Sequence, residues 1–143
     1  MSLEDRVLSG ELERIRPSMG EVSRLLDAAR RRAETAENEA CYPEIRLEQA
    51  YEAILNCALA ALLASGLRPT NRPGKHVMVI SSLRETLGVP AERVDYYQML
   101  RTLRHRTLYE GTLDVSPSQA EQSAAEARAL LAQTTKWLEA RGA

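Results

Sequence analysis

The densest group of side chains that could do chemistry lies in residues 94–109, which read VDYYQMLRTLRHRTLY. Arg101, Arg104 and His105 stand three and four residues apart, so they share one face of a helix. Arg106 and Tyr109 complete the group. Arginine binds phosphate oxygens in bidentate fashion, and a nearby histidine can act as an acid or a base near neutral pH. The sequence therefore predicts a ligand-binding site for the phosphate of a nucleotide or of RNA on these five residues.

The same spacing also has a purely structural interpretation. Arginines on one helix face commonly pair with acids of a neighbouring helix, and Glu48 and Glu52 are suitable partners in the apolar segment upstream. His76 follows Gly74 at the start of another predicted helix, and we expect a structural role for it. Spacing alone leaves the binding and structural interpretations open.

Other kinds of site find little support. The chain contains no HExxH, GxxxxGK, GxSxG or CxxC pattern, which excludes the common signatures of zinc proteases, phosphate loops, serine hydrolases and thiol redox sites. Two histidines far apart in sequence do not form a metal site on their own. The acids fall on predicted solvent faces, so paired-carboxylate catalysis is not indicated. We expect neither a metal nor a cofactor.

Charge and composition restrict the class of protein further. The chain carries a net charge of −1, yet residues 66–109 hold eight Arg or Lys against three Asp or Glu. The middle of the chain is therefore its electropositive part. Cys41 and Cys57 show no metal spacing, and the absence of a disulfide framework fits a reducing cytoplasm. The longest uncharged stretch, residues 53–67, is too short to span a membrane.

The elements that must position these residues are predicted to be helices, because strong helix formers dominate the chain. We expect one all-α domain over residues 1–143: an antiparallel up-and-down bundle of four to five main helices with a shorter crossover helix. Residues 1–16 should form an N-terminal helical extension, and no segment alternates like a strand. The expected helices span residues 3–14, 17–38, 43–65, 75–87, 90–110 and 117–138, with a basic loop over 67–74. The helix over 43–65 is apolar on most of its circumference and should be central.

Three segments give the chain a family resemblance: EQAYEAILNCALAALL, GKHVMVISSLRETLG and the arginine-rich RHRTLYEG. With the order of helices, they make residues 18–138 resemble the HEPN domain superfamily, named for its occurrence in higher eukaryotes and prokaryotes and its association with nucleotide binding. The resemblance implies an antiparallel bundle of four or five helices that pairs as a homodimer. Many such domains are RNA-cleaving toxins of toxin–antitoxin pairs or partners of small nucleotidyltransferases.

The catalytic signature of that superfamily is an Arg followed, after four to six residues, by a His. Carried over, the Arg is Arg104, the polar residue after it is His105, and Tyr109 occupies the His position. Tyrosine, with a pKa near 10, is a poor base at neutral pH. The resemblance thus implies a non-catalytic homodimeric module that binds a nucleotide, RNA or a nucleotidyltransferase-type partner. The alternatives are a metal-independent endoribonuclease using Arg104, His105 and Tyr109, and a purely structural dimerisation domain. Either the last helix or the arginine-rich helix could form the dimer interface.

Overall fold

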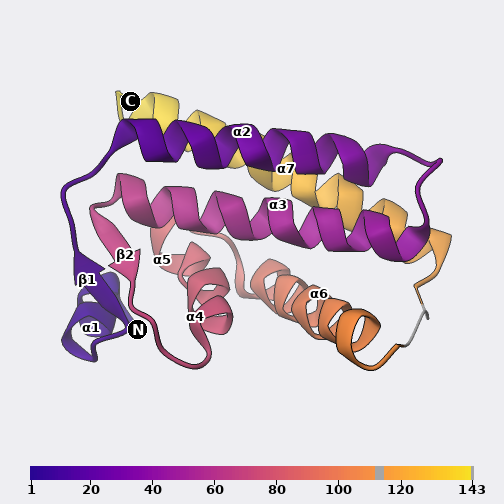
Figure 1. Ribbon diagram of the computed structural model, residues 1–143. Helices are drawn as coiled ribbons and strands as arrows, with labels where there is room; N and C mark the ends of the chain where they lie inside the picture. Colours follow the sequence, from indigo (N-terminus) through magenta and orange to yellow (C-terminus); the bar gives the residue numbers. More distant parts are fainter. Residues whose placement is uncertain (112–114, 143) are drawn as a thin grey trace.

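Helix α3 (Pro43–Ala64) is the centre of the molecule, as its apolar circumference predicts. Most of its side chains are buried, and α2, α6 and α7 all pack against it (Figure 1). Pro43 is its first residue, where a missing N–H costs nothing. The helix ends before Gly66, whose positive φ of 77° lets the chain turn away without the strain that a side chain would bring.

The computed structural model describes residues 1–111 and 115–142, and their elements are arranged as an antiparallel bundle with a crossover, as predicted (Figure 1). The chain alternates in direction through α2, α3, α6 and α7, while α4 and α5 make the crossover between α3 and α6. None of the described helices is both long enough and apolar enough to cross a membrane. The elements in chain order are α1 (Leu3–Leu8), β1 (Leu12–Arg14), α2 (Met19–Glu37), α3, β2 (Leu67–Pro69), α4 (Lys75–Ser81), α5 (Leu83–Thr86), α6 (Ala91–Tyr109) and α7 (Pro117–Ala140).

The N-terminal helical extension predicted for residues 1–16 is wrong beyond Leu8. Helix α1 begins with a capping box of Ser2 and Asp5, but Gly10 has a φ of 83° and turns the chain out of the helix. Residues 12–14 then form β1, which pairs antiparallel with β2 in what was expected to be a loop. Pairing lets Leu12 reach the core, where it is 1% exposed, and satisfies the backbone groups of both short segments.

Two helix boundaries also differ from the prediction. The helix expected over residues 75–87 is divided at Ser82, whose buried hydroxyl donates to the Val79 carbonyl at 2.6 Å. Such a side-chain bond back to the preceding turn competes with the regular helical pattern. Helix α2 starts at Met19, two residues after the expected start at residue 17, and Ser18 is its N-cap. Helix α7 begins with a capping box of Ser116 and Gln119.

Candidate functional site

One pocket of about 460 Å³ brings the predicted site residues together with residues from another part of the chain. We call it the basic pocket. One wall is the loop before α4 together with the first turn of α4, and the other is the C-terminal half of α6. Its lining residues are Asn71, Arg72, Gly74, Lys75, His76, Val77, Arg101, Arg104, His105 and Tyr109.

All permanently charged side chains among the described lining residues of the basic pocket are cationic. Arg72 and Lys75 lie on the α4 side and Arg101 and Arg104 on the α6 side, so four permanent cations line one hollow. Among the residues that the structure describes, no Asp or Glu lines it. A hollow lined by one sign of charge focuses the field and attracts ions of the opposite sign.

Four of the five residues that the sequence singled out line this pocket. Arg101, Arg104 and His105 share one face of α6, as their spacing requires, and Tyr109 follows one turn later. Arg106 is exposed on α6 and does not line the basic pocket. The helix geometry therefore accounts both for the residues that gather and for the one that does not.

Two side chains of helix α3 contact Arg104 and orient it. Its Nη2 lies 2.7 Å from Oε1 of Glu52, and the two side chains are 22% and 20% exposed. Its guanidinium also lies over the ring of Tyr51, 5.4 Å from the ring centre. The expectation that an arginine of this helix pairs with Glu48 or Glu52 is thus confirmed for Arg104 and Glu52. Arg104 is oriented in advance, and part of its charge is balanced.

Arg101 has a different environment. Its Nε donates to Oε1 of Gln98 at 3.2 Å, and within the residues that the structure describes no carboxylate lies at ion-pair distance from it. The Gln98 amide donates in turn to the Val77 carbonyl at 2.9 Å and to Ser81 Oγ at 3.2 Å. Gln98 therefore ties α6 to α4, the two elements whose side chains form opposite walls of the pocket.

His76 lies on the α4 wall and is accessible to solvent. Histidine is the residue type on this wall that ordinarily titrates near neutral pH. Partial burial lowers the pKa of His76 from its usual value, the nearby cations Arg104, Lys75 and Arg101 lower it further, and Glu52 opposes them. These effects favour the neutral imidazole of His76 over the imidazolium. The sequence predicted a structural role for His76 and did not predict that it lines a pocket. The one sequence feature that pointed to this region was the excess of positive charge over residues 66–109.

The α6 wall of the pocket includes two neighbouring aromatic rings, those of His105 and Tyr109. The rings of His105 and Tyr109 lie 4.7 Å apart between centres, tilted by 42°. Tyr109 is 71% exposed. An exposed aromatic ring next to cationic side chains is the usual platform on which a nucleic-acid base stacks.

The N-terminal segment positions one cation of the pocket. Nη1 of Arg72 donates to the Ser9 carbonyl at 2.9 Å, and Thr70 Oγ1 donates to the Gly10 carbonyl at 2.6 Å. Arg72 lies so close to Gly10 that a Cβ added there would be 2.5 Å from its Nη2. Glycine is therefore favoured at this position by its positive φ, and a larger residue would also displace the end of the Arg72 side chain.

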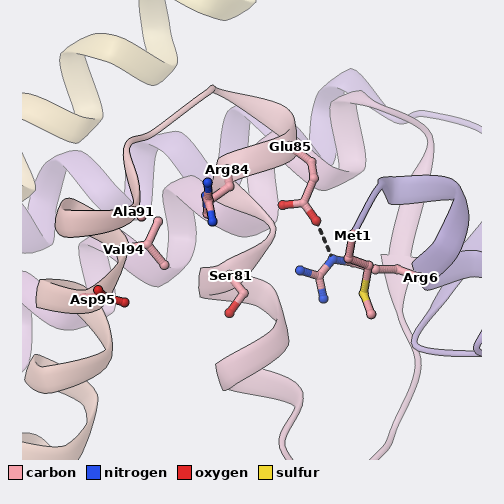
Figure 2. A pocket seen from close by; sticks show the side chains of 8 residues that line it. All are labelled: Met1, Arg6, Ser81, Arg84, Glu85, Ala91, Val94 and Asp95. Carbon is pink, nitrogen blue, oxygen red and sulfur yellow. Dashed lines mark hydrogen bonds and ion pairs between the residues drawn. The ribbon is translucent and has the colours of Figure 1, made fainter.

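A second pocket, of about 490 Å³, lies between α1, the α4–α5 crossover and the start of α6 (Figure 2). It mixes charges, because Arg6, Arg84, Glu85 and Asp95 all line it. The Nε of Arg6 donates to Oε1 of Glu85 at 2.8 Å, an ion pair with both side chains largely buried. This ion pair joins α1 to α5. Because two acids and two arginines line the pocket, it suits a polyanion less well than the basic pocket does.

Within residues 1–111 and 115–142, no three His, Cys, Asp or Glu side chains are close enough together to hold a metal ion. The side chains that line the basic pocket offer guanidinium, ammonium, imidazole and phenol groups. Comparison with known proteins gives no family: no protein-family model matches the chain, and no curated protein is significantly similar to it.

Proposed function

We propose that this chain is a HEPN-like, non-catalytic binding module whose basic pocket binds the phosphate of a nucleotide or of single-stranded RNA. The observation that carries the proposal is the convergence of four permanent cations, from two separate segments, on a hollow whose described lining residues include no carboxylate. The resemblance of residues 18–138 to the HEPN superfamily points to the same class of ligand.

Each wall of the pocket has a part in this binding. Arg101, with no carboxylate partner among the described residues, supplies the freest guanidinium, and Arg104 is the best oriented. Arg72 and Lys75 close on the phosphate from the α4 side. The exposed ring of Tyr109, packed on His105, offers a base a surface for stacking. Phosphate contacts supply affinity, and stacking favours a nucleotide over inorganic phosphate.

Fluorescence anisotropy with a labelled single-stranded RNA hexamer tests the proposal. Arg101→Gln should weaken binding by roughly tenfold and reduce the slope of log affinity against log salt by about 0.7, the value for one lost phosphate contact on a single strand. Arg106→Gln is the matched control, because it removes the same charge from the same helix outside the pocket. Equal effects of the two variants, or no binding at low salt, would refute the proposal.

A homodimer and a nucleotidyltransferase-type protein partner are part of the same proposal, on the strength of the family resemblance. Light scattering of the purified chain measures its mass directly, with and without the RNA hexamer. A mass of twice the 15.9 kDa chain is expected. A monomer at all concentrations would contradict the dimer and weaken the family interpretation, and it would leave the charge of the pocket as the sole support for RNA binding.

One observation favours a second candidate, a metal-independent endoribonuclease: His76 and His105 line the same pocket as Arg104. Two imidazoles beside a bound phosphate can serve as base and acid in phosphodiester cleavage. Cleavage of RNA in the presence of a chelator, abolished in both His76→Gln and His105→Gln, is the result expected of this candidate. RNA that remains intact under conditions where it is bound would exclude it.

A further inference from the structure

We propose that the basic pocket takes a terminal phosphate, the monoester at the end of a nucleotide or oligonucleotide, and that His76 binds it as an imidazolium. This inference rests on the proposed function and deepens it by naming the chemical form of the phosphate. It also gives a role in binding to a residue outside the arginine-rich helix.

The number of cations argues for the monoester. A phosphodiester carries one negative charge, whereas a phosphate monoester carries about −1.5 to −2 near pH 7 and presents three acceptor oxygens. Arg72, Lys75, Arg101 and Arg104 all line one hollow, and in the part of the chain that the structure describes only Arg104 pairs with an acid, Glu52. A lone diester would leave most of this charge uncompensated, so the pocket is better matched to the more highly charged group.

The surroundings of His76 argue for a proton taken up on binding. In the free protein the groups acting on the ring are Glu52 from α3, Arg101 and Arg104 from α6, and Lys75 beside it. Partial burial lowers the pKa of His76 the most, the cations lower it further, and Glu52 opposes both effects. A phosphate dianion in the pocket would neutralise those cations and add an acceptor next to the ring. The imidazolium, disfavoured in the empty pocket, becomes the favoured form in the occupied one.

Two measurements test this inference. The first compares RNA hexamers of one sequence that differ only in bearing a 5′-phosphate or a 5′-hydroxyl, both labelled at the 3′ end. The phosphorylated hexamer should bind about tenfold more tightly, the equivalent of one additional strong ionic contact. Uridine monophosphate, with inorganic phosphate beside it, then shows whether the terminal phosphate must belong to a strand, to a nucleotide, or to neither.

The second measurement follows the proton itself, because a phosphate monoester also titrates near pH 6 and affinity alone would not separate the two groups. The chain has two histidines, so in His105→Gln the remaining imidazole resonance is that of His76. On saturation with uridine monophosphate, the pKa of His76 measured by nuclear magnetic resonance should rise by about one pH unit, which is a tenfold preference of the ligand for the protonated protein. His76→Gln in the wild-type background should weaken binding more at pH 6 than at pH 8.

The outcomes separate this inference from the proposed function. Equal affinity for the two hexamers, with both lost in Arg101→Gln, would overturn the terminal-phosphate inference and leave RNA binding in place. A pKa of His76 that is unchanged by bound nucleotide would overturn its role as an imidazolium. If the two hexamers, uridine monophosphate and inorganic phosphate all fail to bind, the proposed function fails as well.

Discussion

Replacing Glu52 by glutamine is expected to destabilise the bundle and to strengthen RNA binding at the same time. The carboxylate of Glu52 lies 2.7 Å from Arg104 Nη2, with both side chains about one-fifth exposed. Two unit charges about 4 Å apart interact by roughly 4 kcal/mol at an effective dielectric constant of 20 and by about 1 kcal/mol in water. Since glutamine is cheaper to desolvate than a carboxylate, the net loss of folding free energy should be roughly 1–2 kcal/mol.

The effect on binding should have the opposite sign. A bound phosphate and Glu52 compete for the same guanidinium, and the two anions repel each other across Arg104. Removing a negative charge roughly 8 Å from the phosphate should be worth about 1 kcal/mol after screening, or about a fivefold gain in affinity. Thermal unfolding and fluorescence anisotropy with the RNA hexamer measure the two quantities on one preparation.

Glu48→Gln provides the matched control for this experiment. Glu48 lies one turn earlier on α3 and forms no ion pair in the part of the chain that the structure describes. Its substitution should change neither quantity by more than a few tenths of a kcal/mol. If Glu52→Gln lowered the affinity for RNA along with the stability, Glu52 would be a positioning residue for Arg104 and not a competitor of the ligand, and the reasoning would be refuted.

Three further predictions concern folding. Gly10→Ala should cost about 1–2 kcal/mol of unfolding free energy in urea titrations, because its φ is 83° and the new Cβ would meet Arg72; an unchanged midpoint would contradict this. Ser116→Ala should cost about 1 kcal/mol by removing the capping box of α7, whereas Ser118→Ala, at an exposed position, should cost little. Burial raises the pKa of three tyrosines to about 12: Tyr51, Tyr96 and Tyr97. Because these pKa values are higher in the folded protein than in the unfolded chain, their contribution to stability is complete below about pH 10 and is lost as the pH rises toward 12. Urea midpoints that do not fall over that interval would refute it.

Much of the fold could be predicted because its signals are local. The capping box of Ser116 and Gln119 sets the start of α7 whatever the helix packs against. The central place of α3 follows from its apolar circumference, since a helix without a polar face must be covered on all sides. Such features depend on residues three or four positions apart, and the sequence displays them directly.

The small sheet was missed for the complementary reason. Each strand is three residues long, and Leu12 pairs with Pro69 more than fifty positions away in the sequence. Three residues are too few to show the alternation that marks a strand. The division of α4 from α5 at Ser82 was missed as well, because a serine hydroxyl that bonds back to Val79 resembles any other serine in the sequence.

Part of the candidate site could likewise be predicted from local sequence patterns, and part depends on contacts between distant segments. Helix periodicity alone placed Arg101, Arg104 and His105 on one face, because residues three and four apart are neighbours on any α-helix. What they face was decided by tertiary structure: the packing of α4 on α6 brings His76 and Lys75 to the opposite wall. Packing on α3 likewise gives Arg104 its partner. The sequence by itself therefore determined a cationic helix face, and only the folded chain made it a pocket, because contacts between distant segments depend on how whole elements pack together.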